Sequence, residues 1–256
     1  MRPPKVIQEN KPTNNSQFVP PEHTYFQAFP TTMVSGFLDL DLEQVADDIR
    51  NIIFKFKDIN DDPHQNYTTY FSRELREETS KLPWFNDFAN AMKDMYVLFI
   101  KEQYNKHVHD LTRHDVHFFA WVNLYSRENS HDAHNHMNST LSGTWYIKVP
   151  KNAGPITFFN PAMTAAFTHA AIDEQKPHSD VPNVTVLGTN GSQTQLVCRP
   201  ENGQFMMWPS YMLHSIQAGD FNDPDYERIC ISFNLHHLDS IEDTDDGDQM
   251  SYDFLR

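Results

Sequence analysis

The chain has 256 residues, a formal net charge of −15 at pH 7 and 39% hydrophobic residues. A chain of this length can bury one hydrophobic core, and β-barrels of this size commonly fold as a single domain. The negative charge disfavours broad binding to nucleic acid or to anionic membranes, because phosphate contacts need clustered Lys and Arg. No apolar stretch is long enough to cross a membrane, and the first residues do not resemble a secretory leader.

Cysteine usage points to a cellular compartment. The chain contains two cysteines, Cys198 and Cys230. Two thiols are too few for the disulfide framework of a secreted domain. We therefore expect a protein of the reducing cytoplasm.

The first part of the chain predicts an arm followed by helices. Residues 1–21 are rich in Pro, Asn, Gln and Ser and lack apolar periodicity, which is typical of a flexible arm. Apolar residues then recur at helical spacing over 42–56 and again over 85–103. We expect residues of about 40–106 to form a helical support.

After Asp115 the period changes from helical to two, which indicates a strand over 117–125. Both faces of this strand carry large side chains. Further strands are expected at 143–149, 156–159, 184–187, 195–199, 204–208 and 228–236, with Gly, Pro and Asn at the turns between them. Helices first and many short strands afterwards favour a mainly β barrel or sandwich that helices brace on one side.

This organisation predicts one domain, 22–238, whose barrel core spans about 116–236. An acidic tail, 239–256, follows it. The segment 160–200, which contains His169 and His178, is either a lid over one end of the barrel or a surface excursion.

The pair His134 and His136 is the strongest chemical signal in the chain. Side chains at i and i+2 of an extended segment point to the same side, so both imidazoles can reach one metal ion that a distant third ligand completes. On a straight strand, which rises about 3.3 Å per residue, Asp132, His134 and His136 cannot all bind one ion. Either Asp132 with His134 or His134 with His136 makes the pair, and His134 belongs to both.

His214 is the candidate for the third ligand. It follows an apolar strand and a corner that contains Pro209. A histidine in this position is more often a packed residue than a ligand. The upstream pair favours the ligand.

A third signal is the strand 228–235, whose polar face carries Arg228, Cys230, Ser232 and Asn234. A solvated edge strand would show the same alternation. However, Asn123 and Tyr125 give the strand 117–125 polar groups too, so the two strands could face one pocket inside a barrel. Arg228 would then bind a carboxylate through two hydrogen bonds, with Ser232 or Tyr125 adding a hydroxyl.

Several spaced motifs together resemble a family of 2-oxoglutarate and iron(II) dependent oxygenases that is common in bacteria and marine phages. The resemblance is dense from Phe118 to Asn234 and loose over the helical first half. The motifs are Trp121-x-Asn123, His134-x-His136-x-x-Ser139-x-x-Ser142-Gly143-x-x-Tyr146, Pro209-Ser210-x-x-x-His214 and Arg228-Ile-x-Ile-Ser-Phe-Asn234.

The resemblance implies a double-stranded β-helix, or jelly roll, that holds Fe(II) at one mouth through His134, His136 and His214. The cosubstrate 2-oxoglutarate would chelate the iron with its 2-oxo acid end and meet Arg228 with its distal carboxylate. With O2, such an enzyme couples the decarboxylation of 2-oxoglutarate to succinate with the oxidation of a substrate C–H bond, most simply as a hydroxylase.

The chain departs from the wider superfamily at two positions. That superfamily places Asp or Glu where His136 stands, so this site would offer three neutral imidazoles or would recruit Asp132 instead. Cys230 stands where many relatives carry a serine that supports the distal carboxylate, and Ser232 or Tyr125 could compensate.

Two other functions remain open at this point. A three-histidine cupin-type dioxygenase would act without 2-oxoglutarate, with Arg228 holding the carboxylate of the substrate. A jelly-roll binding module would have no catalytic activity. The substrate itself, a small molecule or a protein side chain, and the oligomeric state are not readable, whereas a membrane or nucleic-acid partner is not expected. The cytoplasm would be that of a phage-infected bacterial host if the chain is of phage origin.

Overall fold

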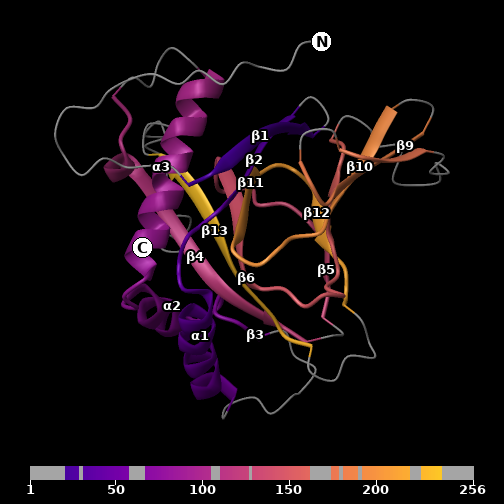
Figure 1. Ribbon diagram of the computed structural model, residues 1–256. Helices are drawn as coiled ribbons and strands as arrows, with labels where there is room; N and C mark the ends of the chain where they lie inside the picture. Colours follow the sequence, from indigo (N-terminus) through magenta and orange to yellow (C-terminus); the bar gives the residue numbers. More distant parts are fainter. Residues whose placement is uncertain are drawn as a thin grey trace, which may run out of the picture.

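The computed structural model describes most of the chain in nine segments (Figure 1). These segments are 21–28, 31–57, 67–104, 110–126, 129–161, 174–178, 181–189, 192–219 and 226–237. The predicted arm, apart from residue 21, and the predicted acidic tail lie outside them.

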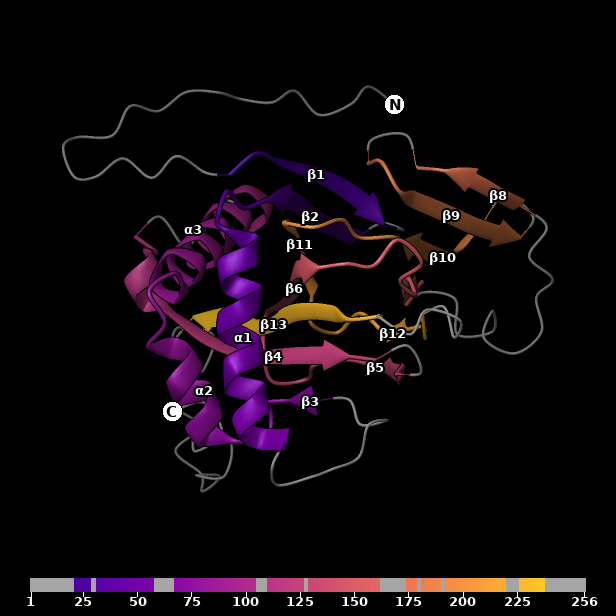
Figure 2. The ribbon, with the colours of Figure 1, turned by 60° about the horizontal axis from the view of Figure 1, so that its bottom comes forward.

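Two antiparallel sheets make up the body (Figures 1 and 2). The seven-stranded sheet has the order β1-β2-β11-β6-β13-β4-β3, and the six-stranded sheet has the order β5-β12-β7-β10-β9-β8. The strands of the first are β1 His23–Ala28, β2 Thr31–Phe37, β3 Tyr67–Thr68, β4 Val116–Tyr125, β6 Leu141–Lys148, β11 Gln204–Pro209 and β13 Arg228–His237. Those of the second are β5 His131–His134, β7 Ile156–Phe159, β8 Glu174–Pro177, β9 Val184–Thr189, β10 Ser192–Cys198 and β12 His214–Ile216.

The eight strands β4, β5, β6, β7, β10, β11, β12 and β13 form a double-stranded β-helix. The first of these strands pairs with the last, β4 with β13, and the pairing continues inward as β5 with β12, β6 with β11 and β7 with β10. One long hairpin is therefore folded over so that its strand pairs alternate between the two sheets, which is the topology of a jelly roll. This confirms the predicted fold class.

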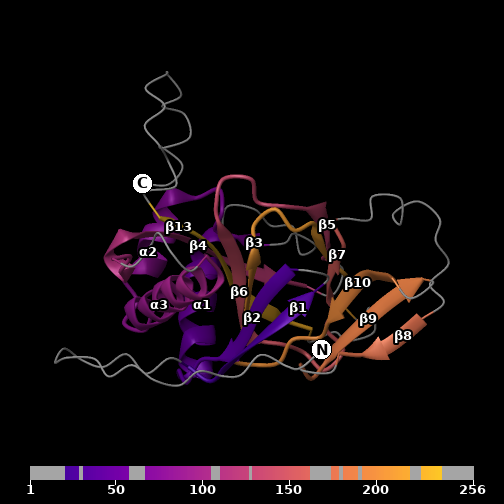
Figure 3. The same cartoon turned by 90° about the horizontal axis from the view of Figure 1, so that it is seen from above.

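Helices cover the outer face of the seven-stranded sheet, on the side away from the second sheet (Figures 1 and 3). They are α1 Leu42–Lys57, α2 Arg73–Ser80 and α3 Phe85–Tyr104. The α3 residue Phe88 stacks on Trp145 of β6, with ring centroids 5.0 Å apart, and contacts Phe233 of β13 edge-on at 5.7 Å. Burial of each such ring stabilises the fold by about 1.5–3 kcal/mol.

Gly143 of β6 allows this packing. A Cβ at this position would lie 2.4 Å from Cζ of Phe233 and 2.6 Å from the carbonyl oxygen of Met206. Both distances are shorter than van der Waals contact, so a larger residue here would displace the Phe233 ring from its present packing.

The predicted helices at 42–56 and 85–103 are confirmed as α1 and α3, and strands occur near each predicted range. The expectation that helices come first was wrong, because the β1–β2 hairpin precedes α1 and joins the main sheet. The strand β2 is buried on both faces, with Met33 in the core between the sheets and Val34 in the core under the helices. A strand buried on both faces shows no alternation in the sequence.

In the segment 160–200, the strands predicted at 184–187 and 195–199 are confirmed as β9 and β10. The strand β8 pairs with β9, and the three extend the second sheet outward (Figure 3). His169 lies outside the described residues, and the backbone N–H of His178 donates to the carbonyl of Val184 at 2.8 Å. Among the described helices, none has the length and apolar character to cross a membrane.

Candidate metal centre

Three histidines meet at one end of the barrel. His134 ends β5 and is paired directly with His214, which begins β12, while His136 follows β5 by two residues. Their candidate ligand atoms all lie within 4.8 Å of one another. Small ring rotations would bring three such nitrogens to about 2.1 Å from a common ion. In the described part of the chain, no other group of three His, Cys, Asp or Glu side chains is arranged in this way.

The backbone selects the ligand nitrogen on two of the rings. The Nδ1 atom of His134 lies 2.7 Å from the carbonyl oxygen of Asp132, and Nδ1 of His214 lies 3.0 Å from the carbonyl oxygen of Met212. A carbonyl can only accept, so each Nδ1 carries the proton. Each Nε2 therefore keeps a lone pair, which is the form that binds a metal.

The surroundings keep the rings of His136 and His214 neutral. Burial, together with the neighbouring imidazoles, lowers the pKa of His214 to about 3 and the pKa of His136 to about 4. At pH 7 neither ring carries a proton on its free nitrogen. A divalent cation could therefore bind these imidazole nitrogens without first displacing a proton.

Asp132 is not a member of the group. Its side chain is exposed, and its contact with His134 is made by its backbone carbonyl. Of the two pairs that the sequence left open, the structure brings together His134 with His136.

Backbone hydrogen bonds tie the segment after β5 to the corner before β12. The N–H of His136 donates to the carbonyl of Ser210 at 2.9 Å, and the N–H of Ser210 donates to the carbonyl of Thr140 at 3.1 Å. The two segments that carry His136 and His214 are therefore held together through one residue, Ser210.

Four side chains reinforce this link, and we call them the serine chain: Ser139, Ser210, Ser142 and Asn234. Successive oxygens along it lie 2.7, 2.8 and 2.8 Å apart. Ser142 donates to the amide oxygen of Asn234, so Ser210 is left to donate to Ser142 and Ser139 to donate to Ser210. Each hydroxyl then donates once, and the chain connects the segment after β5 and the start of β6 with the corner before β12 and with β13.

Arg228 lies at the start of β13 and is 1% exposed. Its Nη1 donates to the carbonyl of Gly154 at 2.7 Å, and its Cζ lies 5.3 Å from the ring centre of Tyr146 and 5.6 Å from that of Tyr125. Its Nε and Nη2 atoms are buried and have no hydrogen-bond partner among the described residues. Nε and Nη2 form the edge through which a guanidinium makes a bidentate hydrogen-bonded pair with a carboxylate.

Two further buried donors also lack partners in the described part of the chain: the hydroxyl of Tyr146, whose ring lies beside the guanidinium, and Nε1 of Trp208, whose ring contacts His214. Leaving a buried donor unpaired costs about 1–3 kcal/mol. Such a set indicates a place where a polar ligand completes the hydrogen bonding. Burial raises the pKa of the Tyr146 phenol, so it is a hydrogen-bond donor at neutral pH.

The sequence interpretation did not single out Tyr146 or Trp208. Tyr146 could have been found by alternation, because Ser142, Thr144 and Tyr146 share one face of β6. Trp208 is the penultimate residue of β11, which is buried on both faces, so the sequence does not show which face of the sheet this side chain lies on. Its ring contacts that of His214 at 5.0 Å.

The other predicted pocket residues take supporting positions. The amide of Asn123 donates to the hydroxyl of Ser232 at 3.1 Å, and Ser232 also lies 3.3 Å from the hydroxyl of Thr144. Tyr125 packs against Arg228, and its hydroxyl lies 3.5 Å from Nδ1 of His131. Burial raises the pKa of Cys230 to about 11, so this thiol is neutral.

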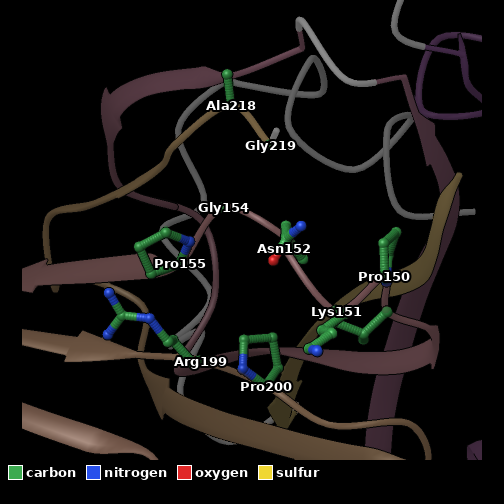
Figure 4. Close-up of a pocket in the computed structure, with 11 residues that line it drawn as sticks. Pro150, Lys151, Asn152, Gly154, Pro155, Arg199, Pro200, Ala218 and Gly219 are labelled. Carbon is green, nitrogen blue, oxygen red and sulfur yellow. The ribbon is translucent and has the colours of Figure 1, made fainter. Parts of the chain in front are cut away.

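A separate pocket of about 390 Å³ lies where β6 ends and β7 begins, whereas the histidines lie where β5 ends and β6 begins (Figure 4). Lys151, Arg199 and the backbone of Gly154 are among its lining residues. Gly154 also accepts the hydrogen bond from Arg228, so this pocket adjoins the arginine, and none of the three histidines lines it.

One family of known proteins resembles the second half of this chain. Residues 119–234 match the model of the family described as "Putative 2OG-Fe(II) oxygenase". No curated protein matches the chain.

Solved structures give partial likenesses. A prolyl-4-hydroxylase from Pseudomonas putida is 12% identical over 80% of this chain and 92% of that chain, with a TM-score of 0.45. EvdO2 from Micromonospora carbonacea var. aurantiaca, complexed with 2-oxoglutarate, is 11% identical over 79% and 85%, with a TM-score of 0.46. A 2OG-Fe(II) oxygenase family oxidoreductase from Burkholderia pseudomallei is 12% identical over 60% of this chain and 59% of that chain, with a TM-score of 0.34. The strand pairing given above remains the basis of the fold assignment.

Proposed function

We infer from the family match over residues 119–234 that this chain is a 2OG-Fe(II) oxygenase, and we propose that it is a hydroxylase with His134, His136 and His214 as its iron ligands. The observation that supports this best is the combination of a three-histidine group with a buried arginine whose donor edge is unpaired. One feature fits a divalent ion and the other fits a carboxylate.

The three histidines would hold Fe(II) through neutral imidazole nitrogens and leave coordination positions open for the cosubstrate and O2. When bound, iron with 2-oxoglutarate and O2 supplies the oxidation of a substrate C–H bond, coupled to decarboxylation of the 2-oxo acid to succinate. The protein's part is to orient the reactants and keep bulk water away. His214 serves this by its burial, since it is 3% exposed and packs against Phe158 and Trp208.

Arg228 would bind the distal carboxylate of 2-oxoglutarate through Nε and Nη2, while its Nη1 stays on Gly154. The hydroxyl of Tyr146 is the best-placed additional donor, because its ring lies beside the guanidinium and its oxygen is unpaired in the described structure. Tyr146 would thus take the supporting role that the sequence interpretation gave to Ser232 or Tyr125.

Anaerobic titration with Fe(II), followed by 2-oxoglutarate, tests these assignments. We expect His134→Ala to lose iron binding and Arg228→Ala to keep iron while binding 2-oxoglutarate more weakly. His114→Ala, which removes an exposed histidine outside the group, is the matched control and should change neither. Unaltered iron affinity in His134→Ala would refute the metal site.

A cupin-type dioxygenase that acts without 2-oxoglutarate is the second candidate, and the all-histidine ligand set favours it. Arg228 would then bind a carboxylate of the substrate. Succinate formation measured with and without 2-oxoglutarate, in the presence of Fe(II) and O2, separates the two. Oxygen consumption that does not depend on 2-oxoglutarate would support the second candidate.

We further propose that the substrate is a small molecule or a protein side chain and that the protein works in the cytoplasm, in a phage-infected bacterial host if it is of phage origin. The two cysteines are buried and free, which supports a reducing compartment. Cell fractionation with a tagged chain tests the location.

A further inference from the structure

Aromatic side chains form a continuous wall beside the histidines, and we call Tyr70, Phe71, Phe119 and Trp121 the aromatic cluster. Tyr70 contacts Phe71 and Trp121 with ring centroids 5.0 Å apart in each pair, and Phe119 at 5.7 Å. Trp121 in turn lies 5.9 Å from the ring of His136. Ring contacts therefore lead without a break from the surface at Phe71 to one of the proposed iron ligands.

The outer end of this wall is Phe71, which at 86% is the most exposed of the large hydrophobic side chains in the described chain. Met137, 79% exposed, directly follows His136, and Tyr211, 55% exposed, directly follows Ser210, whose carbonyl accepts the His136 N–H. Exposed apolar side chains that border a candidate site indicate a binding surface.

The cations near the aromatic cluster are used to build it. Arg76 donates to the carbonyls of Thr69 and Tyr70, and its Cζ lies 4.9 Å over the ring of Phe119. Arg73 pairs with Glu77 on the exposed face of α2. Neither arginine is left to bind an anionic group, so the surface favours stacking over ion pairing.

We propose that the aromatic cluster binds an uncharged aromatic ring of the substrate and thereby presents the adjoining atoms to the metal centre. This inference rests on the proposed function for the identity of that centre. A ring stacked on Tyr70 and Phe71 lies along the wall that leads through Trp121 to His136. Aromatic pairs of this kind add about 0.5–1.5 kcal/mol beyond their buried area, and a substrate without a ring would lose that contribution.

Binding of defined probes to the protein loaded with Ni(II) and 2-oxoglutarate tests the inference, because Ni(II) suits imidazole ligands and lets binding be measured without turnover. The probes are N-acetyl-tryptophanamide and N-acetyl-leucinamide, which are uncharged and differ in the ring. Saturation-transfer NMR and calorimetric titration should show tighter binding of the tryptophan probe. Equal affinity for the two probes would overturn the proposal.

Variants locate the binding. Phe71→Ala should weaken the tryptophan probe by about three- to tenfold. Because Phe71 is 86% exposed, its removal should leave the fold intact. Phe37→Ala, at an exposed phenylalanine on β2, is the matched control and should leave the affinity unchanged. Unchanged affinity in Phe71→Ala would also overturn the proposal.

Two peptides of nine residues, one with a central Trp and one with Leu in its place, distinguish the source of the ring. If the Trp peptide binds more tightly than N-acetyl-tryptophanamide, the result supports a protein side chain as the substrate. If it binds more weakly, the result supports a small-molecule substrate. Both results support recognition of an aromatic ring. Succinate formation is measured separately. If the protein binds the ring at Phe71 but forms no succinate, the proposed oxygenase function is contradicted and the proposed ring-binding site is retained.

Discussion

The two faces of the seven-stranded sheet have opposite characters. On the helix side, β13 presents Ile229, Ile231, Phe233 and Leu235, which are all fully buried among other apolar side chains. On the inner side the same strand presents Arg228, Cys230, Ser232 and Asn234, and donors of Arg228, Tyr146 and Trp208 remain unpaired in the described structure. One strand thus contributes to the apolar core with one set of alternate residues and to the proposed ligand site with the other.

This contrast predicts that substitutions on the two faces have separate consequences. Phe233→Ala, on the outer face, should destabilise the protein by about 3–5 kcal/mol, because it leaves a cavity under Phe88 and Trp145. Denaturant unfolding measures this loss. Iron affinity of the folded fraction should stay unchanged, and a parallel loss of iron affinity would show that the two faces are coupled.

Arg228→Met tests the inner face. We expect 2-oxoglutarate binding to weaken by about 2–5 kcal/mol, since the variant lacks the charged donors for a carboxylate. The stability of the ligand-free protein should stay the same or rise, because the variant removes a buried charge with two unpaired donors. Calorimetric titration and thermal unfolding measure the two effects. A large loss of stability without ligand would mean that Arg228 holds the fold together through Gly154.

Ser210→Ala tests how the serine chain positions the histidines. The variant keeps the backbone bonds to His136 and Thr140 but interrupts the hydroxyl chain between Ser139 and Ser142. Metal affinity should fall by about 10-fold, as for other groups that orient a metal ligand, and the visible spectrum of the Co(II) form should change. Ser80→Ala, which removes an exposed hydroxyl on α2, serves as the control. Unchanged metal affinity would reduce the serine chain to a stabilising contact.

The smallest expected effect is a pH dependence of the metal-free protein. The pKa of His214 is lowered to about 3 and that of His136 to about 4, so the unfolded chain takes up protons below pH 6.5 while the folded chain does not. Stability should therefore fall as the pH drops from about 6.5 to 4. Thermal unfolding across this range measures it, and His214→Gln should show a shallower slope. An equal slope in that variant would assign the dependence to other groups.

The sequence was informative about the site to different degrees. The i, i+2 spacing of His134 and His136 and the alternation of β13 are local, so they could be read without a fold, and the predicted positions of α1, α3 and β4 were close to the observed ones. The choice between His136 and Asp132 could not be made locally, because it depends on how the chain leaves β5 and meets Ser210. The strand β2 was missed because burial on both faces removes the alternation.

Local patterns were sufficient to predict a mainly β barrel or sandwich, a histidine pair and a candidate arginine, because side-chain periodicity is a property of neighbouring residues. The jelly roll itself was implied by the resemblance of the spaced motifs to an oxygenase family. Pairing between distant strands decided the rest. Two strand registers are decisive, and each joins segments about 80 residues apart. One places His134 opposite His214. The other places Tyr146 opposite Cys230, on the strand that carries Arg228. A shift of one residue in either pairing would turn these side chains to the opposite face, and only the closed barrel shows which face is inside.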